Sequence, residues 1–463
     1  MACLSRTDSL EWQIARRHHQ SFVATGLPFA LALLGAICAA PAQAEETDQT
    51  ALQEALAVHG QATVVVQGVT SFASPYTADN SLAPSQVKET VDVTLYLGIK
   101  PWDGAELWAN PEIDQGFGLS NTLGVAGFPS AEAYKVGKST PYFRLQRLFL
   151  RQTIGLGGER SAVSSTANQL AASQSANRLV LTVGKFGVGD VFDTNRYAHD
   201  PRGDFLNWSI VDTGSFDYAA DAWGYSYGAA AEWYQGEWTL RLGAFNLSKV
   251  PNGETLETGF GQSELDAEIE YRHTIGGHAG AVRLAVFRNR GRFARLAEAS
   301  AVIESTGVIP DLATLRRPAS RWGGQLNVEQ EVTDTLGVFV RAGVSDGRYE
   351  AYDFTDIDRT LAVGASLGGK GWHREADRIG LATVINGISK QRQRYLADGG
   401  IGILIGDGAL PNPGNECITE AYYSAQVIKN VTLSADYQRV LHPGYNRDRG
   451  PANVFALRLH GGF

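Results

Sequence analysis

Cysteine is nearly absent from this chain, with 3 among 463 residues. Cys3 and Cys38 fall within the first 44 residues, which are expected to be removed, so only Cys417 is left in the mature chain. A single cysteine forms no internal disulfide, and metal sites built on cysteine pairs are also excluded.

Long hydrophobic runs are missing as well. No run of about 18 apolar residues follows position 45, so no transmembrane helix is expected in the mature chain. Acidic residues outnumber basic ones, and the net charge of -9 argues against a nucleic-acid partner. The same acidity mildly favours cations over anions as solutes.

The amino terminus has the three parts of a secretory signal peptide. A basic region at 16–19 precedes an apolar stretch at 27–40, and the small residues at 42–44 match a cleavage site. We therefore expect residues 1–44 to be a signal peptide rather than a retained helical anchor, for which the apolar stretch is short.

Residues 45–59 predict a short amino-terminal helix, because Leu52 and Leu56 lie one turn apart on one face. Two interpretations stay open for it: a segment that caps the periplasmic end of a barrel, or an ordinary surface helix.

Apolar and polar residues alternate along the rest of the chain, as in strands whose two faces meet different surroundings. In 91–100, Val91, Val93, Leu95, Leu97 and Ile99 alternate with polar residues and glycine. Similar segments are found at 61–69, 91–100, 104–112, 147–154, 178–186, 222–233, 237–246, 265–272, 281–288, 322–329, 336–344, 358–367, 377–385, 417–426, 431–438 and 453–463. About sixteen strands of roughly ten residues predict an all-β fold, a transmembrane antiparallel β-barrel that takes residues 60–463 as one domain.

The last strand, 453–463, organises this prediction. Phe455, Leu457 and Phe463 share one face, whereas Arg458 and His460 lie on the other. An apolar face toward lipid, a polar face toward a wet lumen and an aromatic carboxy terminus are expected of a strand that closes an outer-membrane barrel.

The lengths of the connections alternate in the way a barrel with a periplasmic amino terminus requires. Short connections are expected inside at 100–103, 234–236, 332–335 and 427–430, and long ones outside at 70–90, 113–143, 187–221, 289–320 and 386–416. One inside connection, 155–177, is long; its Ser/Ala/Gln-rich composition predicts a mobile linker.

Motifs for catalysis or cofactor binding are not found. The Gly137-Lys138-Ser139-Thr140 stretch fails as a phosphate-binding loop because Glu132 stands where a glycine is required. Neither a His-Glu-x-x-His zinc motif nor a Gly-x-Ser-x-Gly elbow occurs, so we expect no enzyme and no cofactor. His199 and its neighbouring aspartates are interpreted as loop-shaping polar residues in preference to a metal or hydrolytic cluster.

The third outside loop, 187–221, is the candidate pore constriction. Its carboxylates, guanidiniums and amides suit sugar hydroxyls, and an aromatic ring suits the apolar face of a sugar. The candidate contacts are Asp193, Asn195, Arg196, Asp200, Arg202, Asp204, Asn207 and Trp208. The alternative is an external lid that never enters the pore.

Arg144, Arg147 and Arg151 are candidates for a positive ladder on the inner wall, since an arginine facing lipid at mid-membrane costs about 2–4 kcal/mol. Their spacing does not give them one strand face, so a bulge or a helical turn is expected between them. Two of the three are expected to face inward, and Arg144 and Arg147 join the candidate site.

Two charged outside stretches allow alternatives. Arg288, Arg290, Arg292 and Arg295 suit lipopolysaccharide phosphate, but a solvated face is the favoured interpretation. The acidic stretch 346–358 suits divalent cations or simply keeps a loop soluble, and the second interpretation is favoured.

Several ordered strings resemble the carbohydrate-selective porin family (OprB family). They are GFGLSNTLGVAGFP at 116–129, LTVGKF at 181–186, FDTN at 192–195, DPR at 200–202, DFLNW at 204–208, DYAADAWGY at 217–225 and YNRDRGP at 445–451. The resemblance covers about residues 60–463 and implies a sixteen-stranded channel in the Gram-negative outer membrane that passes small sugars without chemistry.

Beside that function, the family also suggests a divalent cation (manganese) channel as the alternative. A barrel enzyme or adhesin is disfavoured. The expected partners are outer-membrane lipid, lipopolysaccharide and the solutes themselves, with a homotrimer as an open possibility.

Overall fold

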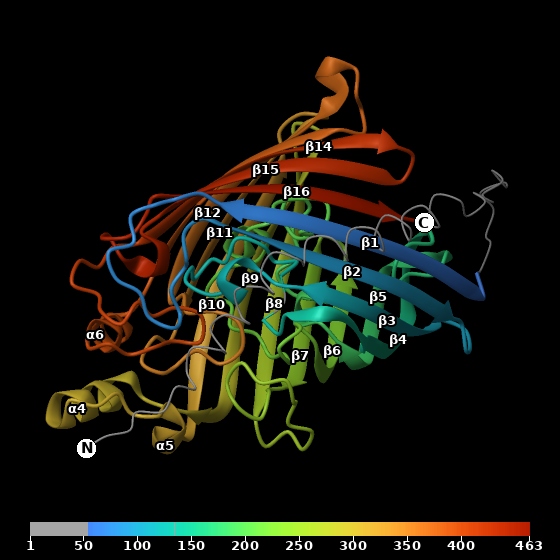
Figure 1. Cartoon of the computed structure of the whole chain (residues 1–463). Coiled ribbons are helices and arrows are strands. Elements are labelled where there is room, and N and C mark those ends of the chain that lie inside the picture. The colour runs from blue at the N-terminus through green and yellow to red at the C-terminus, as the bar shows by residue number, and fades with distance from the viewer. Residues whose placement is uncertain (1–53, 134) are drawn as a thin grey trace, which may run out of the picture.

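The computed structural model describes residues 54–133 and 135–463, which form one closed antiparallel β-barrel (Figure 1). The sixteen strands are β1 (Leu56–Val69), β2 (Gln86–Ile99), β3 (Ala105–Gly116), β4 (Lys138–Val163), β5 (Ala172–Phe186), β6 (Ser226–Gln235), β7 (Trp238–Asn246), β8 (Ser263–Ile275), β9 (His278–Phe293), β10 (Arg317–Glu331), β11 (Leu336–Ser345), β12 (Arg359–Gly368), β13 (Arg378–Gly387), β14 (Glu416–Ile428), β15 (Val431–Leu441) and β16 (Ala452–Gly462). Each pairs with its sequence neighbours, and β1 pairs with β16. All sixteen predicted strands are confirmed.

The alternation along each strand separates an apolar outer surface from a polar interior. On β16, Phe455 and Leu457 are 52% and 56% exposed, whereas Arg458 between Leu457 and Leu459 is fully buried inside the barrel. Exposed large apolar side chains recur on the outward faces of the other strands. A soluble protein would leave such a belt in water, whereas a bilayer covers it.

Closure of the barrel depends on the carboxy terminus. The backbone N–H of Phe463 donates to the Gly60 carbonyl at 2.9 Å, and the N–H of Gly60 donates to the Phe463 carbonyl at 3.1 Å. A Cβ atom at position 60 would lie 2.5 Å from the Phe463 ring, so a larger residue there would displace that ring. The last strand therefore closes the sheet as predicted.

Long and short connections lie at opposite ends of the barrel. The long ones are 70–85, 117–137, 187–225, 247–262, 294–316, 346–358, 388–415 and 442–451, and the short ones are 100–104, 164–171, 236–237, 276–277, 332–335, 369–377 and 429–430. The long connections carry helices α3 (Trp208–Val211), α4 (Leu296–Thr306), α5 (Leu312–Leu315) and α6 (Lys390–Ala397) and the 3₁₀ turns η2 (Leu119–Asn121), η3 (Val188–Asp190) and η5 (Pro443–Tyr445), whereas η4 (Gly369–Trp372) belongs to a short one. Helices α4, α5 and α6 gather at the end away from the carboxy terminus (Figure 1).

No helix among residues 54–133 and 135–463 is both long enough and apolar enough to cross a membrane. The predicted helix over 45–59 lies outside the described residues up to position 53, and its last residues, from Leu56 on, belong to β1. That part of the prediction is wrong because Leu56 and Val58 alternate with buried Ala57 and pair with β2. The two-residue alternation of β1 begins at Leu56, inside the range that was predicted to be helical.

The predicted mobile linker over 155–177 is also wrong. Strands β4 and β5 extend through most of it, and only 164–171, here called the inward turn, connects them. Gly157 and Gly158 have φ values of +101° and +84° at register shifts in the hairpin. Backbone hydrogen bonds between β4 and β5 form this Ser/Ala/Gln-rich hairpin although its side chains show no hydrophobic alternation. The prediction was wrong because it relied on the composition of the segment.

Candidate functional site

The connection between β5 and β6, here called the lumen loop (187–225), lies inside the barrel. Most of its residues are buried although it contains only two short helical turns. Its hydrogen-bond partners lie on the inward faces of the strands, so the loop crosses the lumen and is no external lid.

Carboxylates of the wall accept hydrogen bonds from the backbone of the lumen loop. The pairs are Glu268 with the N–H of Asp193 at 3.0 Å, Glu329 with Arg196 at 2.7 Å, Glu420 with Leu206 at 2.6 Å and Asn207 at 2.9 Å, and Glu264 with Ala219 at 3.1 Å. Buried backbone N–H groups outside regular structure need such acceptors.

Donors of the wall satisfy the carbonyls of the same loop. Arg341 donates to the carbonyl oxygens of Ile210 at 2.7 Å and Asp193 at 3.0 Å, and Arg458 donates to that of Pro201. The lumen loop is therefore attached along its length through its main chain.

Asp217 joins the lumen loop to the connection 346–358. Its carboxylate pairs with Arg321 and accepts the backbone N–H groups of Tyr352, Asp353 and Phe354 at 2.7–2.9 Å. Burial would raise the pKa of Asp217, but the Arg321 guanidinium and these donors lower it below its ordinary value.

The acidic residues of 346–358 are structural, which overturns the favoured interpretation as solubilising charges. Asp353, Asp356 and Asp358 are at most 2% exposed. Arg392 of α6 pairs with Asp356 at 2.8 Å and with Asp358 at 3.0 Å.

Four of the predicted site residues hold the lumen loop in place and do not line its cavity. Asp193 accepts from Thr213 and Asn327, and the Asn195 amide donates to Asn327 at 2.8 Å. In separate contacts, Asp204 pairs with Arg378 at 3.0 Å, and Asn207 caps α3 and donates to the Gly127 carbonyl at 2.8 Å. The side chains of these four residues stabilise the fold of the lumen loop.

Arg196 lies apart from the other predicted residues. Its side chain is 56% exposed and pairs with Glu331 at 3.2 Å, near the short-turn end of the barrel.

Four of the other five predicted residues, Arg147, Asp200, Arg202 and Trp208, line one cavity of about 400 Å³, here called the outer cavity, and Arg144 does not. Sequence reasoning missed most of its other walls, which include Tyr96, Phe128, Glu132, Lys135, Asp190, His199, Tyr218, Trp223, Tyr225 and Phe354. Only the aromatic and charged composition of the strings at 116–129 and 217–225 hinted at them. The cavity size is in the range typical of sites for small ligands.

An aromatic cluster forms one side of the outer cavity. Trp208 stacks on Phe128 at 5.3 Å with an interplanar angle of 8° and on Phe354 at 5.1 Å with an angle of 26°. Its indole N–H has no acceptor in the described part of the chain. Trp208 is 4% exposed and its indole nitrogen is buried, so this ring packs the aromatic wall together rather than presenting a free donor to the cavity.

Charged side chains form the other side. Arg147 holds Asp190 with two contacts of 2.6 and 2.7 Å, while Arg202 approaches Glu132 at 3.5 Å and Asp92 at 3.7 Å. Burial raises the pKa of the Glu132 carboxyl, and the Arg202 guanidinium opposes that shift.

Lys135 joins this wall from another outside loop. Its ammonium lies 3.6 Å from the centroid of the Phe354 ring. Burial lowers the pKa of Lys135 to about 8, although Asp353 opposes the shift.

All three arginines of β4 face the lumen, one more than predicted. Arg144 lies over the Trp223 ring at 3.3 Å, and Arg151 donates to the Asn168 carbonyl at 2.7 Å. The β3–β4 register shifts next to Asn110, and this bulge brings Arg144 onto the face of the other two. The predicted irregularity is therefore confirmed as a bulge.

A second cavity of about 540 Å³, here called the inner cavity, lies nearer the short-turn end. It is lined by Arg151, Arg178, Glu232, Tyr234 and Arg241 among others. The two cavities share Ala167, Asn168, Asp190 and His199 as wall residues. The lumen loop and the inward turn thus meet where one cavity passes into the other.

His199 stands at this junction, and each of its ring nitrogens lies close to an oxygen atom. Nδ1 lies 3.2 Å from Asp212, and Nε2 lies 3.1 Å from the Gly189 carbonyl. Burial would lower the pKa of His199, but Asp212 outweighs it and raises the pKa above 6.5.

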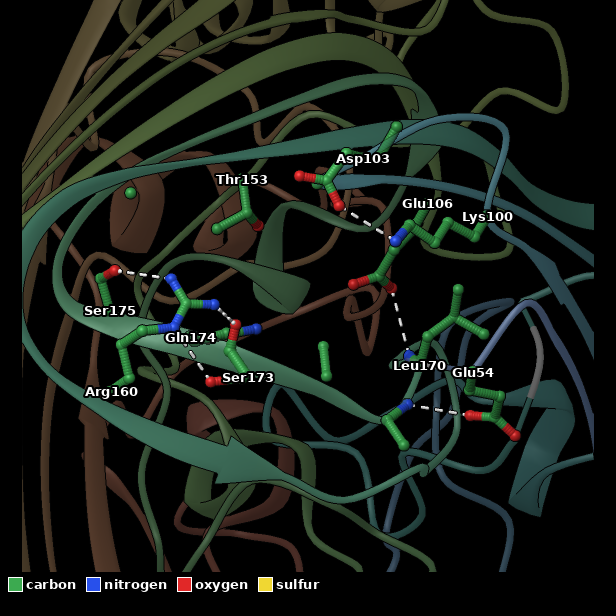
Figure 2. Close-up of a pocket in the computed structure, with 15 residues that line it drawn as sticks. Glu54, Lys100, Asp103, Glu106, Thr153, Arg160, Leu170, Ser173, Gln174 and Ser175 are labelled. Carbon is green, nitrogen blue, oxygen red and sulfur yellow. Dashed lines mark hydrogen bonds and ion pairs between the residues drawn. The ribbon is translucent and has the colours of Figure 1, made fainter. Parts of the chain in front are cut away.

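The inward turn is anchored beside a small pocket of about 140 Å³ at the short-turn end (Figure 2). Figure 2 shows Glu106 directed at the backbone N–H of Leu170 and Glu54 at that of Ala171, with distances of 3.3 and 2.8 Å. Arg160 donates to Ser173 and Ser175 across the same hairpin.

One group in the described part of the chain, His278 with Glu331 and Asp334, has donor atoms close enough together to hold a metal ion. It lies at the short turns and lines neither the outer nor the inner cavity.

A closed sixteen-strand barrel with an apolar exterior, a charged interior and an inserted loop is a transmembrane channel of the outer-membrane type. The carbohydrate-selective porin, OprB family, matches residues 79–463, and the chain belongs to that family. It is accordingly a β-barrel of the Gram-negative outer membrane, from a family of channels rather than enzymes.

The chain is similar to several solved structures, and the first of them supports the fold. The high-pH structure of Pseudomonas putida OprB matches with a TM-score of 0.68 and 17% identity over 88% of this chain and 94% of that one. The low-pH structure of the same protein gives a TM-score of 0.48 with 13% identity over 88% and 93% of the two chains. The outer membrane channel DcaP of Acinetobacter baumannii gives 0.48 with 12% identity over 88% and 97%. No curated protein matches the sequence.

Proposed function

We propose that this channel passes small sugars, mono- or oligosaccharides, by passive diffusion, and that the outer cavity is the site where they are held in transit. The observation that carries the proposal is the pairing of an aromatic cluster around Trp208 with the guanidiniums of Arg147 and Arg202 across one lumen cavity. The family description supports the same solute class.

The chemistry of a sugar fits both sides of this cavity. The ring carbons of a pyranose present an apolar face to an aromatic ring, and its hydroxyls accept hydrogen bonds from guanidinium donors. The carboxylates of Glu132 and Asp190 accept hydrogen bonds from sugar hydroxyls in turn.

The hydrogen bonds of two carboxylates in the lumen loop favour a sugar over a divalent cation as the solute. Asp193 and Asp217 already accept from side-chain and backbone donors. They therefore shape the loop and are not available as a cation ladder.

The test is block of single-channel ion current by a panel of sugars in planar bilayers. Arg202→Gln and Trp208→Phe are each expected to weaken sugar block by about 1–3 kcal/mol, the scale of one lost charged hydrogen bond or aromatic contact. Arg196→Gln is the matched control because it lies in the same loop but outside the cavity, and it should leave block unchanged.

Equal weakening in all three variants would show that the loop acts only through its fold. Saturable block by Mn²⁺ that disappears on Asp190→Asn, without block by any sugar, would replace the sugar proposal with a cation channel.

A further inference from the structure

The outward face of β9 carries three arginines in a row beyond an apolar segment. Leu284 and Val286 are 55% and 56% exposed on this face, and Arg288, Arg290 and Arg292 continue it toward the long-loop end. Residues two apart on a strand are about 7 Å apart, so the guanidiniums leave the apolar belt in successive steps.

The neighbouring strands fix the level of the first arginine. Arg288 is paired with Leu265 of β8 and with Trp322 of β10, both more than half exposed. The Arg288 guanidinium lies 5.1 Å from the Trp322 ring centroid and donates to Ser320 at 3.1 Å. Exposed tryptophan at a barrel rim marks the boundary between hydrocarbon and headgroups. Arg288 is therefore at the boundary, with Arg290 and Arg292 beyond it.

Inward and outward arginines on these strands differ in their partners. The inward-facing Arg283 pairs with Glu270 and Glu329, and Arg321 pairs with Asp217. Among the residues that the structure describes, no carboxylate lies within 4.0 Å of the guanidiniums of the three outward arginines. Carboxylates of the protein neutralise the inward arginines, whereas the three outward arginines can bind an external anion.

Polar side chains flank the outermost pair. Arg290 is paired with Ser263 of β8 and with Ser320 of β10, and Arg292 is paired with Pro318 and also donates to the Arg316 carbonyl at 3.2 Å. Arg295, the fourth arginine of the run, lies beyond β9 and caps α4 instead.

We propose that this face, defined by Arg288, Arg290 and Arg292, binds the phosphate of a phosphorylated, saccharide-headed lipid in the outer leaflet. Acyl chains of that lipid pack on Leu284 and Val286, and its phosphate lies across Arg290 and Arg292. A guanidinium binds phosphate through two parallel hydrogen bonds, and an ammonium does not reproduce that geometry. The serine hydroxyls beside Arg290 suit sugar hydroxyls of the headgroup.

The experiment counts bound lipid by native mass spectrometry on the full barrel in detergent, with diphosphorylated lipid A as the probe. Arg290→Gln with Arg292→Gln is expected to reduce lipid A binding at least about tenfold relative to wild type. Arg290→Lys with Arg292→Lys keeps the charge and should give an intermediate loss.

Arg439→Gln is the matched control. Arg439 is an exposed arginine on the outward face of β15, close to Tyr437 but with Thr419 and Asn453 as its cross-strand neighbours. A lone arginine should contribute little, so a change of no more than about twofold is expected.

Heat-modifiability on gels and single-channel conductance should be the same in all these variants, since the arginines face away from the lumen. Equal lipid A binding by wild type and the Arg290/Arg292 glutamine variant would overturn the proposal. Binding of phosphatidylglycerol as tight as that of lipid A would overturn the commitment to a saccharide-headed lipid. Neither result touches the sugar site, whose test reads current block in the lumen.

Discussion

Replacing Glu420 by alanine is expected to loosen the lumen loop without unfolding the barrel. Glu420 projects from the inner face of β14 and accepts the backbone N–H groups of Leu206 and Asn207 at 2.6 and 2.9 Å. Alanine leaves both donors buried and unpaired at the start of α3. The loop next to Trp208, and with it the outer cavity, loses two of its attachments to the wall.

The size of the effect follows from the two bonds. A buried donor left without its acceptor costs about 1–3 kcal/mol, so two such donors weaken the attachment by roughly 2–6 kcal/mol. Since about 1.4 kcal/mol is a factor of ten in an equilibrium constant, detached states become at least roughly tenfold more populated. The other wall contacts of the loop remain, so the detachment is local.

Single-channel recording measures this directly. The Glu420→Ala channel should show more open-channel noise and brief events of higher conductance, and Glu420→Gln, which keeps one acceptor oxygen, should show fewer. Glu232→Ala is the control, because Glu232 pairs with Arg241 of the wall and does not touch the loop. If Glu420→Ala and Glu232→Ala gave the same quiet current as wild type, the carboxylate anchors would not be what holds the loop.

Three further predictions concern the junction of the cavities and barrel closure. The ion pair between His199 and Asp212 is fully present below the ordinary histidine pKa of 6.5 and is lost as pH rises through the raised pKa of His199. The channel loses a positive charge over that pH range, so its preference for cations, measured from reversal potentials, should increase. The His199→Gln channel should show no such increase. Ala167→Cys should lose conductance on reaction with a small thiol reagent, whereas full conductance after complete modification would place the inward turn outside the solute path. Phe463→Asp should impair assembly because the aromatic ring against Gly60 is replaced by a charge at the membrane rim; normal amounts of heat-modifiable barrel would contradict this.

The barrel itself was predictable because a lipid-facing strand repeats every two residues and carries its signal locally. Each segment such as 91–100 or 453–463 contains the full evidence for one strand, and the sheet only has to place them side by side. The same local signal failed at Leu56, where the four strand residues 56–59 were too few to compete with the helical pattern before them.

The site was predictable only in part, because its walls come from distant segments. Trp208 and Arg202 were identified from residue type in one loop, but Phe128, Glu132 and Lys135 reach the outer cavity from another outside loop. Asp193 has the same composition signal as Asp200, yet one is buried against Asn327 and the other lines the cavity. Sequence does not distinguish them, since the distinction depends on which wall side chains each aspartate meets.

The wall carboxylates bind the main chain of the lumen loop, so the path of the loop depends little on the side chains that the loop carries. A backbone N–H is present at every position except proline, so substitutions at cavity-facing side chains such as Arg202 leave the anchors at Glu420 and Glu329 intact. Solute preference can then drift, or be redesigned, one side chain at a time on a loop whose path through the barrel is inherited unchanged.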